Sequence, residues 1–159
     1  AKQGSWMVLG HLLCTEPLIA DQPGKPLCGR CQECINQCPT NAIAEPFVID
    51  SRLCLAYHTI ENRNSQLPDQ INNSIGQWIA GCDICQDVCP WNQGEIPSND
   101  DPDVQPKKWI LNLTSNEVLS WNDAKWIEEL RGSALKRIKP WMWRRNAEAI
   151  QKAKKTSKL

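Results

Sequence analysis

The sequence predicts an α+β protein that consists mostly of α-helix and loop. Three observations support this fold class: the residues beyond position 108 carry the caps and apolar spacing of short helices, the candidate strands are few and brief, and two cysteine-rich runs with turn-forming residues dominate the first half. The chain has 159 residues, which is enough for one domain, or for a small domain with an appendage.

Eight of the nine cysteines form a pattern that is typical of iron–sulfur proteins. The first run reads C-x2-C-x2-C-x3-C-P, the bacterial spacing for [4Fe-4S] clusters in which the fourth cysteine ligates the other cluster. By pseudo-symmetry, we expect one cluster to be bound by Cys28, Cys31, Cys34 and Cys89. We expect the other to be bound by Cys38, Cys54, Cys82 and Cys85. The sequence therefore predicts a bacterial dicluster ferredoxin-like domain, with an insertion because Cys54 lies 28 positions before Cys82.

Zinc sites and disulfides are the alternative interpretations of these cysteines. Eight thiolates could form two zinc sites, but the order of the spacings differs from that of a zinc ribbon. Disulfides belong to oxidising compartments, and no secretory signal is visible, so we expect a cytoplasmic protein. The longest apolar run, residues 6–13, is too short to span a bilayer, so no membrane association is expected. Cys14 lies outside the pattern and is expected to be a buried free thiol.

Turn residues, caps and apolar spacing divide the rest of the chain. Two short apolar segments are expected to be strands, over residues 6–9 and 47–49. Three polar or proline-containing segments are expected to be linkers or exposed loops, over residues 21–26, 62–73 and 93–108. In the first half, short helices are expected over residues 30–37 and 53–57, the second with Asp50 or Ser51 as its N-cap.

Four short helices are expected in the last third of the chain. Thr114 and Glu117 form a capping-box sequence at the start of the first helix. Asn122 or Asp123 is expected to cap the second, and Gly132 to end it. The third and fourth helices are expected over residues 133–139 and 141–155, with Pro140 between them.

A formal net charge of zero hides a marked asymmetry along the chain. Residues 1–130 carry 8 Lys and Arg against 17 Asp and Glu, whereas residues 131–159 carry 10 Lys and Arg and a single acid, Glu148. So basic a segment predicts a phosphate-binding surface, the alternative being that the cations are merely solvated. The candidate cations are Lys136, Arg137, Arg144 and Arg145. Five tryptophans are expected to fill a small helical core, namely Trp109, Trp121, Trp126, Trp141 and Trp143.

Four motifs resemble the tRNA epoxyqueuosine reductase family. The first cysteine run, from Cys28 to Ile43, is similar to the family's first cluster motif. The segment from Cys54 to Glu61, C-L-A-Y-H-T-I-E, is similar to its C-I-S-Y-x-T-I-E signature, with Ala56 where serine is usual. The closest similarity lies in residues 81–92, G-C-D-I-C-Q-D-V-C-P-W-N, and residues 131–147 resemble the family's C-terminal helical segment.

The resemblance implies an oxidoreductase that reduces epoxyqueuosine to queuosine at the wobble position of tRNA. It implies two [4Fe-4S] clusters that pass electrons from an external donor to a cobalamin, and a catalytic acid in an N-terminal domain that this chain lacks. The expected parts are residues 1–20 as the tail of that domain, residues 21–98 as the double-cluster domain, and residues 99–159 as a basic, HEAT-like helical segment. A monomer is expected, and the basic segment is expected to contact tRNA.

The resemblance also places candidate site residues around the second cluster. Ala56, Tyr57 and Asp83 are the candidates for the cobalamin-facing side, although Asp83 could simply cap a turn. Thr59 and Glu61 could line the same pocket or could form local caps and pairs, and His58 is expected at the surface or in packing.

Two other functions remain as alternatives at this point. One is a standalone dicluster ferredoxin, an electron carrier that has no substrate of its own. The other is a protein similar to corrinoid-dependent reductive dehalogenases. If the chain were a ferredoxin, residues 57–61 and the basic segment would have no function. If it were a dehalogenase, an export signal would be expected. Both alternatives therefore fit the sequence less well.

Overall fold

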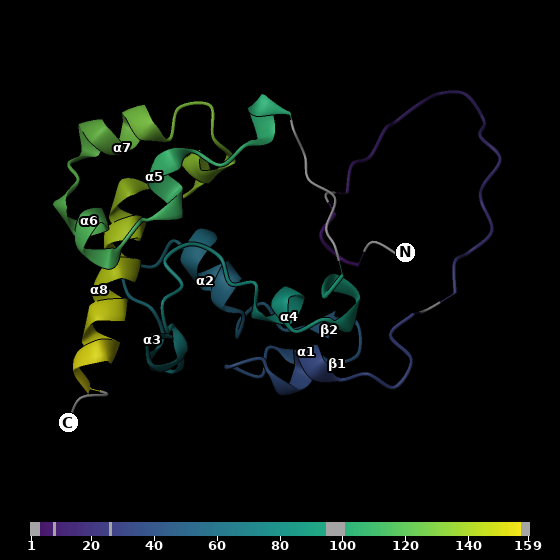
Figure 1. Cartoon of the computed structure of the whole chain (residues 1–159), viewed down its shortest axis with the longest axis horizontal. Helices are drawn as coiled ribbons and strands as arrows, with labels where there is room; N and C mark the ends of the chain where they lie inside the picture. Colours follow the sequence, from purple (N-terminus) through teal and green to yellow (C-terminus); the bar gives the residue numbers. More distant parts are fainter. Residues whose placement is uncertain (1–3, 8, 26, 95–100, 157–159) are drawn as a thin grey trace.

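The computed structural model describes residues 4–7, 9–25, 27–94 and 101–156, and within them it is mostly helix and loop (Figure 1). The first part of the chain contains α1 (Glu33–Asn36), β1 (Ile43–Glu45), β2 (Val48–Ile49), α2 (Leu55–Ile60), α3 (Asp69–Ser74), α4 (Ile84–Asp87) and the 3-10 turn η1 (Pro90–Asn92). The second part contains η2 (Pro102–Val104), α5 (Lys108–Leu111), α6 (Ser115–Ser120), α7 (Asp123–Glu129), η3 (Ala134–Arg137) and α8 (Pro140–Thr156). This arrangement confirms the predicted α+β class.

The sheet of the described residues is a single antiparallel hairpin of β1 and β2. Ile43 pairs with Ile49 and Glu45 with Val48, with an irregularity between the two pairs. At the hairpin tip Phe47 has a φ of +69° and an 81% exposed side chain. Sequence reasoning found β2 but missed β1, whose three residues are too few to show an alternating pattern.

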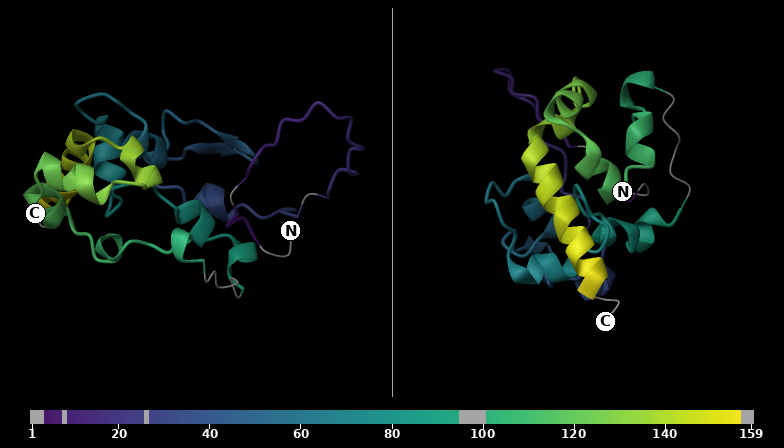
Figure 2. Two further views of the ribbon diagram at one scale, coloured as in Figure 1. Left: turned by 90° about the horizontal axis from the view of Figure 1, so that it is seen from above. Right: turned by 90° about the vertical axis from the view of Figure 1, so that its left-hand side faces the viewer.

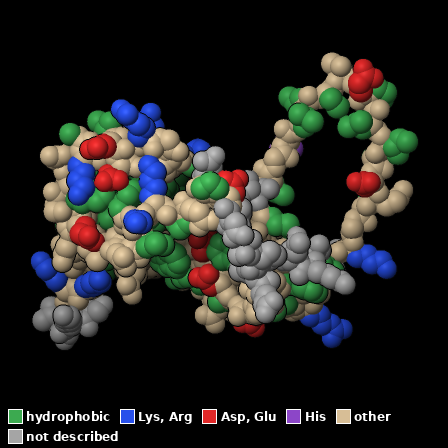
Figure 3. Space-filling model, turned by 45° about the horizontal axis from the view of Figure 1, so that its top comes forward, with side chains coloured by type: hydrophobic (Ala, Val, Ile, Leu, Met, Phe, Trp, Pro, Cys, Tyr) green, Lys and Arg blue, Asp and Glu red, His purple; other side chains and the backbone are tan. Residues whose placement is uncertain are grey.

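The N-terminal residues form an extended arm rather than the predicted strand. Of the predicted strand, the described residues 6, 7 and 9 are not in a strand, and residues 9–25 loop away from the rest of the molecule (Figure 2). The arm exposes Leu12, Leu13 and Ile19 almost completely, and its hydrophobic side chains are visible in Figure 3. Cys14 lies on this arm and is exposed, so the prediction of a buried thiol was wrong.

Helix α8 organises the two hydrophobic cores. One core joins α6, α7 and α8 and contains Trp121, Trp126 and Trp143, with Trp109 packed against it. Trp126 and Trp143 stack with ring centroids 4.9 Å apart. The second core joins α2, α3 and α8 through Leu55, Leu67, Ile71, Ile75, Ala149 and Ile150. Four of the five tryptophans therefore pack as predicted, but Trp141 is 40% exposed.

Several predicted boundaries shift because tertiary contacts decide them. The segment 62–73, predicted as a loop, contains most of α3, because Ile71 anchors this polar turn against α8. Pro140 begins α8 instead of separating two helices, since the first helical turn does not need its missing N–H. The helix predicted over 53–57 begins after Cys54, and the last turn before α8 is the short η3. In the described part of the chain no helix combines the length and apolar character needed to cross a bilayer.

Candidate metal centre

Two neighbouring cavities gather the eight cysteines of the sequence pattern. The first cavity, of about 280 Å³, is lined by Cys28, Cys31, Cys34 and Cys89, together with Cys85. The second, of about 40 Å³, is lined by Cys38, Cys54, Cys82 and Cys85. Apart from Cys85, which lines both cavities, the cysteines are divided between the cavities as in the two predicted ligand sets, and their role as cluster ligands stays a prediction. Cys38 of the first run and Cys89 of the second run have each crossed to the other cavity, as the pseudo-symmetric pattern requires.

Two short helices bring the two runs face to face. Cys34 lies in α1 and Cys85 in α4, and these two helices pack against each other. In each run a proline follows the last cysteine, Cys38 or Cys89, and directs the chain away from the helix. The local sequence therefore folds each run into the same loop and turn, and the packing of α1 on α4 places the two loops around both cavities.

The first cavity is apolar and open on one side. Its wall is completed by Ile35 and Ile43, by the hairpin residues Phe47, Val48 and Ile49, and by Trp91. The indole N–H of Trp91 donates to the carbonyl oxygen of Leu27 at 3.2 Å, which fixes the start of the first run against the end of the second. Cys28 and Cys31 are exposed, so the predicted ligands of this cavity are more accessible to solvent than those of the second cavity.

Contacts with Asn92 tie the N-terminal segment to the first cavity. The side-chain oxygen of Asn92 accepts a hydrogen bond from the Ser5 N–H at 2.7 Å, and its amide donates to the Gln86 carbonyl oxygen at 2.7 Å. Gly4 has a φ of +70°, and a Cβ there would collide with the Asn92 side-chain oxygen. Glycine is therefore required at the position where the arm meets the cluster region.

The thiols of the second cavity lie in a more buried environment. Burial raises the pKa of Cys82 and of Cys85, and neighbouring cysteines of this cavity add to the rise. Burial also acts on Cys38, but hydrogen bonds from the Thr40 backbone and hydroxyl and from the Ala42 N–H outweigh it and lower the pKa of Cys38. The Ala42 N–H lies 3.2 Å from the sulfur, so Cys38 is already solvated by protein donors that suit a thiolate.

The donor set fits iron–sulfur clusters better than zinc. All nine cysteines are free thiols, and among the described residues no three His, Cys, Asp or Glu side chains are grouped so as to hold a single metal ion. Zinc draws four donors to about 2.3 Å from one ion, whereas each thiolate of a four-iron cluster binds a different iron atom. Four thiols spread around the wall of a cavity therefore suit a cluster.

The candidates for the cobalamin-facing side lie next to the second cavity. Ala56 and Tyr57 are on α2 just after Cys54, Ala56 half-buried and Tyr57 39% exposed. Asp83 precedes α4 and is exposed, and its side chain makes no capping hydrogen bond. Partial burial and the neighbouring Asp87 raise the pKa of Asp83. The interpretation of Asp83 as a turn cap is thus not supported by its contacts.

The other residues of the Cys54–Glu61 signature make contacts inside the protein. His58 is buried, with one ring nitrogen 2.7 Å from the Arg52 carbonyl oxygen and the other 2.9 Å from the Asn62 amide. Glu61 pairs with Arg137, whose Nε lies 2.5 Å from one carboxylate oxygen and whose Nη2 lies 2.9 Å from the other. His58 therefore belongs to packing, and Glu61 joins the cluster half of the chain to the basic segment.

The four candidate cations occupy different environments. Lys136 and Arg137 are exposed, and Arg144 is partly exposed and pairs with Asp123 at 2.6 Å. Arg145 is only 8% exposed, and burial followed by the charge of Arg63 lowers the pKa of Arg145. The guanidinium of Arg145 donates to the carbonyl oxygens of His58, Asn62 and Asn64. Its position is therefore that of a structural residue, and the expectation of an exposed RNA contact does not suit it.

Sequence reasoning missed three residues that the structure brings to these sites. Thr40 is buried beside Cys38, and Asn146 is buried where α8 meets α2. Arg63 is exposed and donates to the Arg137 carbonyl oxygen at 3.0 Å, which adds a cation to the basic segment. The only signal for Thr40 and Asn146 was their adjacency to a cysteine-proline pair and to the double arginine. Arg63 stood in a segment predicted to be an exposed loop.

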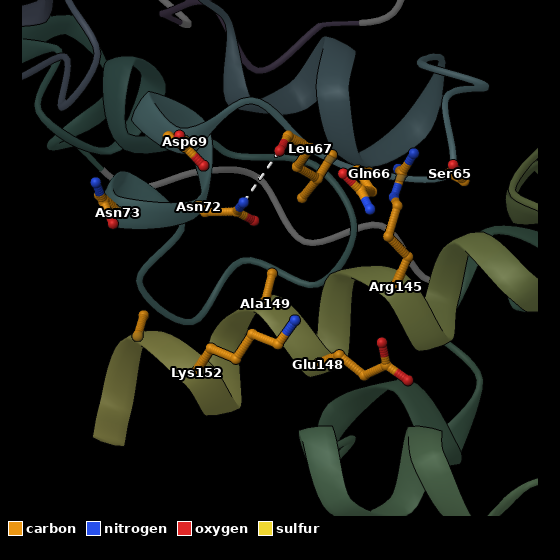
Figure 4. Close-up of a pocket in the computed structure, with 11 residues that line it drawn as sticks. Ser65, Gln66, Leu67, Asp69, Asn72, Asn73, Arg145, Glu148, Ala149 and Lys152 are labelled. Atoms are coloured by element: carbon orange, nitrogen blue, oxygen red, sulfur yellow. Dashed lines mark hydrogen bonds between the residues drawn. The ribbon is translucent and has the colours of Figure 1, made fainter. Parts of the chain in front are cut away.

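A further cavity of about 620 Å³ lies between α3 and α8 (Figure 4). Its wall is polar and includes Gln66, Asn72, Glu148 and Lys152, with the Asn72 amide donating to the Leu67 carbonyl oxygen at 3.0 Å. No predicted cluster ligand lines it. This cavity is therefore separate from the thiol-lined pair.

A family model described as a 4Fe-4S double cluster binding domain matches residues 27–92. The chain is 65% identical over 149 residues to an epoxyqueuosine reductase of Prochlorococcus marinus (strain NATL2A), covering 94% of this chain and 48% of that protein. It is 41% identical over 143 residues to the epoxyqueuosine reductase of Salmonella typhimurium, covering 90% of this chain and 37% of that protein. The chain thus spans about half the length, or less, of these curated relatives.

Solved structures give the same result. An epoxyqueuosine reductase from Bacillus subtilis superposes with a TM-score of 0.79 at 27% identity, covering 89% of this chain and 37% of that chain. An epoxyqueuosine reductase solved with an epoxyqueuosine-modified tRNA-Tyr stem loop superposes with a TM-score of 0.78 at 27% identity, covering 86% of this chain and 36% of that chain. The chain therefore contains a double [4Fe-4S] cluster domain, and its predicted resemblance to the epoxyqueuosine reductase family is confirmed over about half the length of the curated relatives.

Proposed function

We propose that this chain is the electron-relay and RNA-binding portion of an epoxyqueuosine reductase. The complete enzyme would reduce epoxyqueuosine to queuosine at the wobble position of tRNA, with electrons reaching a cobalamin through the two clusters. The observation that carries this proposal is the pair of adjacent cavities, which are lined by eight thiols in total and share Cys85, in a chain similar to that family. Bound clusters would supply one-electron transfer, and this chain supplies their ligands and their surroundings.

The order of the two clusters follows from their exposure. The ligands Cys28 and Cys31 of the first cavity are exposed, which suits entry of electrons from an external donor. The second cavity is lined by the more buried Cys82 and Cys85 and adjoins Ala56, Tyr57 and Asp83, which we propose as the side that faces cobalamin. Ala56 has no hydroxyl, so its side chain can offer the corrinoid only an apolar contact.

We propose the same division of the chain that the motifs predicted. Residues 1–20 would be the tail of an N-terminal cobalamin-binding domain, residues 21–98 would form the cluster domain, and residues 99–159 would form the basic helical segment. The exposed leucines of the arm, such as Leu12 and Leu13, suit a segment that is covered by further protein. We further propose a cytoplasmic monomer that receives its electrons from a separate donor protein.

The proposed RNA contact is a basic surface made of Arg63, Lys136, Arg137, Lys139 and Trp141. Its cations are exposed, and Lys and Arg side chains recur over the helical lobe at the left of Figure 3. The Trp141 ring is 40% exposed and has the Arg145 guanidinium 5.4 Å from its centroid, so the rest of the ring is available to a base. Phosphate contacts by the cations and stacking on an unpaired base are the usual modes of RNA recognition.

The decisive experiment is a turnover assay with the N-terminal portion of a relative supplied. The chain is reconstituted with iron and sulfide under anaerobic conditions, combined with that portion and cobalamin, and incubated with tRNA that contains epoxyqueuosine. Formation of queuosine supports the proposal. A protein that binds two clusters but neither cobalamin nor tRNA would instead be a standalone ferredoxin, and the proposal would fail.

The basic surface is tested by matched charge reversals on the same region of the chain. The double variant Lys136→Glu with Lys139→Glu should weaken tRNA binding and lower the salt dependence of the affinity by about 1 in slope for each phosphate that is no longer neutralised. The control is Lys154→Glu with Lys155→Glu, which makes the same charge change at the far end of α8. Equally weakened binding in both double variants, measured by fluorescence anisotropy across a salt series, would show only a net-charge effect and contradict the proposed surface.

A further inference from the structure

We infer that a buried hydrogen-bond relay through Asn146 and Thr59 positions the ligands Cys54 and Cys82 of the second cluster. The relay joins α8 to α2 and to the loop before α4, three elements that are far apart in the sequence. The inference rests on the proposed function only in taking a cluster to occupy the second cavity. The two residues are positioning residues, since neither lines that cavity.

Asn146 is completely buried, and all the hydrogen-bonding groups of its side chain are used. Its amide nitrogen donates to the Thr59 carbonyl oxygen at 2.9 Å and to the Ile79 carbonyl oxygen at 2.8 Å. Its side-chain oxygen accepts from the Arg145 guanidinium at 2.9 and 3.1 Å. The guanidinium can only donate and the two carbonyls can only accept, so these neighbours fix the orientation of the amide.

Thr59 links Asn146 to Gly81, the residue before Cys82, through hydrogen bonds. Its hydroxyl donates to the Leu55 carbonyl oxygen at 2.8 Å and accepts from the Gly81 N–H at 3.0 Å. Gly81 has a φ of +86°, a conformation that other residues rarely adopt. The hydroxyl thus holds the backbone of Gly81 in this unusual conformation immediately before the cysteine.

The same residues also set the position of Cys54. Helix α2 begins directly after Cys54, and the relay holds this helix at Leu55 and at Thr59. Ile79, two residues before Gly81, is held by Asn146. The distance between Cys54 and Cys82 is therefore governed by one amide and one hydroxyl that are fixed from α8. The first cluster depends on other contacts, namely Trp91 with Leu27 and Asn92 with Ser5.

A change in the relay should consequently affect the second cluster and leave the first cluster unchanged. The reduction potential of an iron–sulfur cluster depends on hydrogen bonds near the sulfurs and on solvent exposure, both of which follow the position of the ligand loop. Loss of the Thr59 hydroxyl would leave the Gly81 N–H without its partner and release the Cys82 loop.

The test compares Thr59→Val, which removes the hydroxyl at nearly constant shape, with Thr59→Ser, which keeps it. The readouts are the iron content of the reconstituted full chain and a redox titration followed by electron paramagnetic resonance (EPR). The signals are assigned to the two clusters with Cys34→Ser and Cys54→Ser. We expect Thr59→Val to shift the midpoint potential of the second cluster, or to reduce its signal relative to the first, and Thr59→Ser to restore the wild-type values.

A second variant guards against a general folding defect. Asn146→Asp keeps the size of the side chain but replaces both donors to the Thr59 and Ile79 carbonyls, so it should reproduce the selective effect on the second cluster. An unchanged second cluster, or an equal change in both clusters, would overturn the inference. Neither cobalamin nor tRNA is needed for these measurements, so a failed turnover assay and a failed relay are distinguishable.

Discussion

Arg144 and Arg145 are adjacent on α8 but lie in opposite environments. The Arg144 guanidinium is partly exposed, where it pairs with Asp123 and donates to the Trp121 carbonyl oxygen at 3.0 Å. Arg145 is buried and donates to three backbone carbonyls of α2 and the segment that follows it. The two residues therefore offer a direct comparison of a surface ion pair with a buried hydrogen-bonded cation.

Arg145→Ala should destabilise the chain by about 2–4 kcal/mol, because several buried acceptors lose their donor. Arg144→Ala should cost at most about 1 kcal/mol, as expected of an ion pair near the surface. The measurement is thermal unfolding of the reconstituted protein followed by circular dichroism under anaerobic conditions. Similar decreases of stability in the two variants would contradict the assignment of Arg145 as a structural residue.

At the residue scale the sequence could not separate these two arginines. Their neighbours in the chain are the same, and the partners of Arg145, which include Asn62 and Asn64, lie more than 80 positions away. The same limit explains why Asn146 was missed and why Trp141 was expected in the core. Burial of a particular side chain depends on which face of α8 meets α2 and α3, and that is a property of the assembled fold.

The start of helix α6, unlike the burial of Arg145, is determined by residues that are neighbours in the sequence. The Thr114 hydroxyl accepts from the Glu117 N–H at 3.2 Å, and the Glu117 carboxylate accepts from the Thr114 N–H at 2.9 Å. Hydrogen bonds from the Thr114 backbone and hydroxyl lower the pKa of Glu117. The capping box predicted from four consecutive residues is therefore confirmed.

Thr114→Ala should remove this cap and destabilise the chain by about 1 kcal/mol, which corresponds to a decrease in Tm of about 2–4 °C. Thr114→Ser is the control, since serine is an equally good N-cap. Ser115→Ala serves as a second control one position further, inside the helix. A Tm of Thr114→Ala equal to that of the wild type would contradict a contribution of this cap to the stability of the chain.

Helix α3 could not be predicted from its local sequence. Its six residues, D-Q-I-N-N-S, contain one apolar side chain and would not be expected to form a helix alone. Ile71 and the adjacent Ile75 are buried against Ala149 and Ile150 of α8, and this burial stabilises the turn. A helix held by its partner in this way has no periodic signal of its own.

At the scale of the whole molecule, the cysteine spacing predicted the partition of the eight thiols between the two cavities. The shared x2-C-x3-C-P ending of the two runs accounts for this placement, because it carries the last cysteine of each run away from the preceding ones, and the assignment of the thiols as cluster ligands stays a prediction. The insertion before Cys82 was also recognised, but its connection to α8 was not. The spacing of the cysteines predicts which thiols share a cavity. The hydrogen bonds that position the walls of the cavity come from segments that are distant in the sequence.

The crossed partition predicts that variants group by cavity and not by sequence run. Cys38→Ser should resemble Cys54→Ser, with loss of the more buried cluster, whereas Cys89→Ser should resemble Cys34→Ser. Each variant should retain about four of the eight iron atoms expected for two four-iron clusters. EPR spectra and iron analysis distinguish the groups. Grouping of Cys38→Ser with Cys34→Ser would contradict the assignment.

Cys85, Ile43 and Ile49 line both cavities, so the two sites share a wall that is made of these side chains. Two clusters bound on either side of this wall would be separated by protein side chains and not by solvent. Bound clusters would supply one-electron transfer across this shared wall, and Cys85 would contribute both to the site in which it is a ligand and to the neighbouring cavity. For the proposed function, this arrangement means that the chain's own contribution is to keep the two cluster sites next to each other.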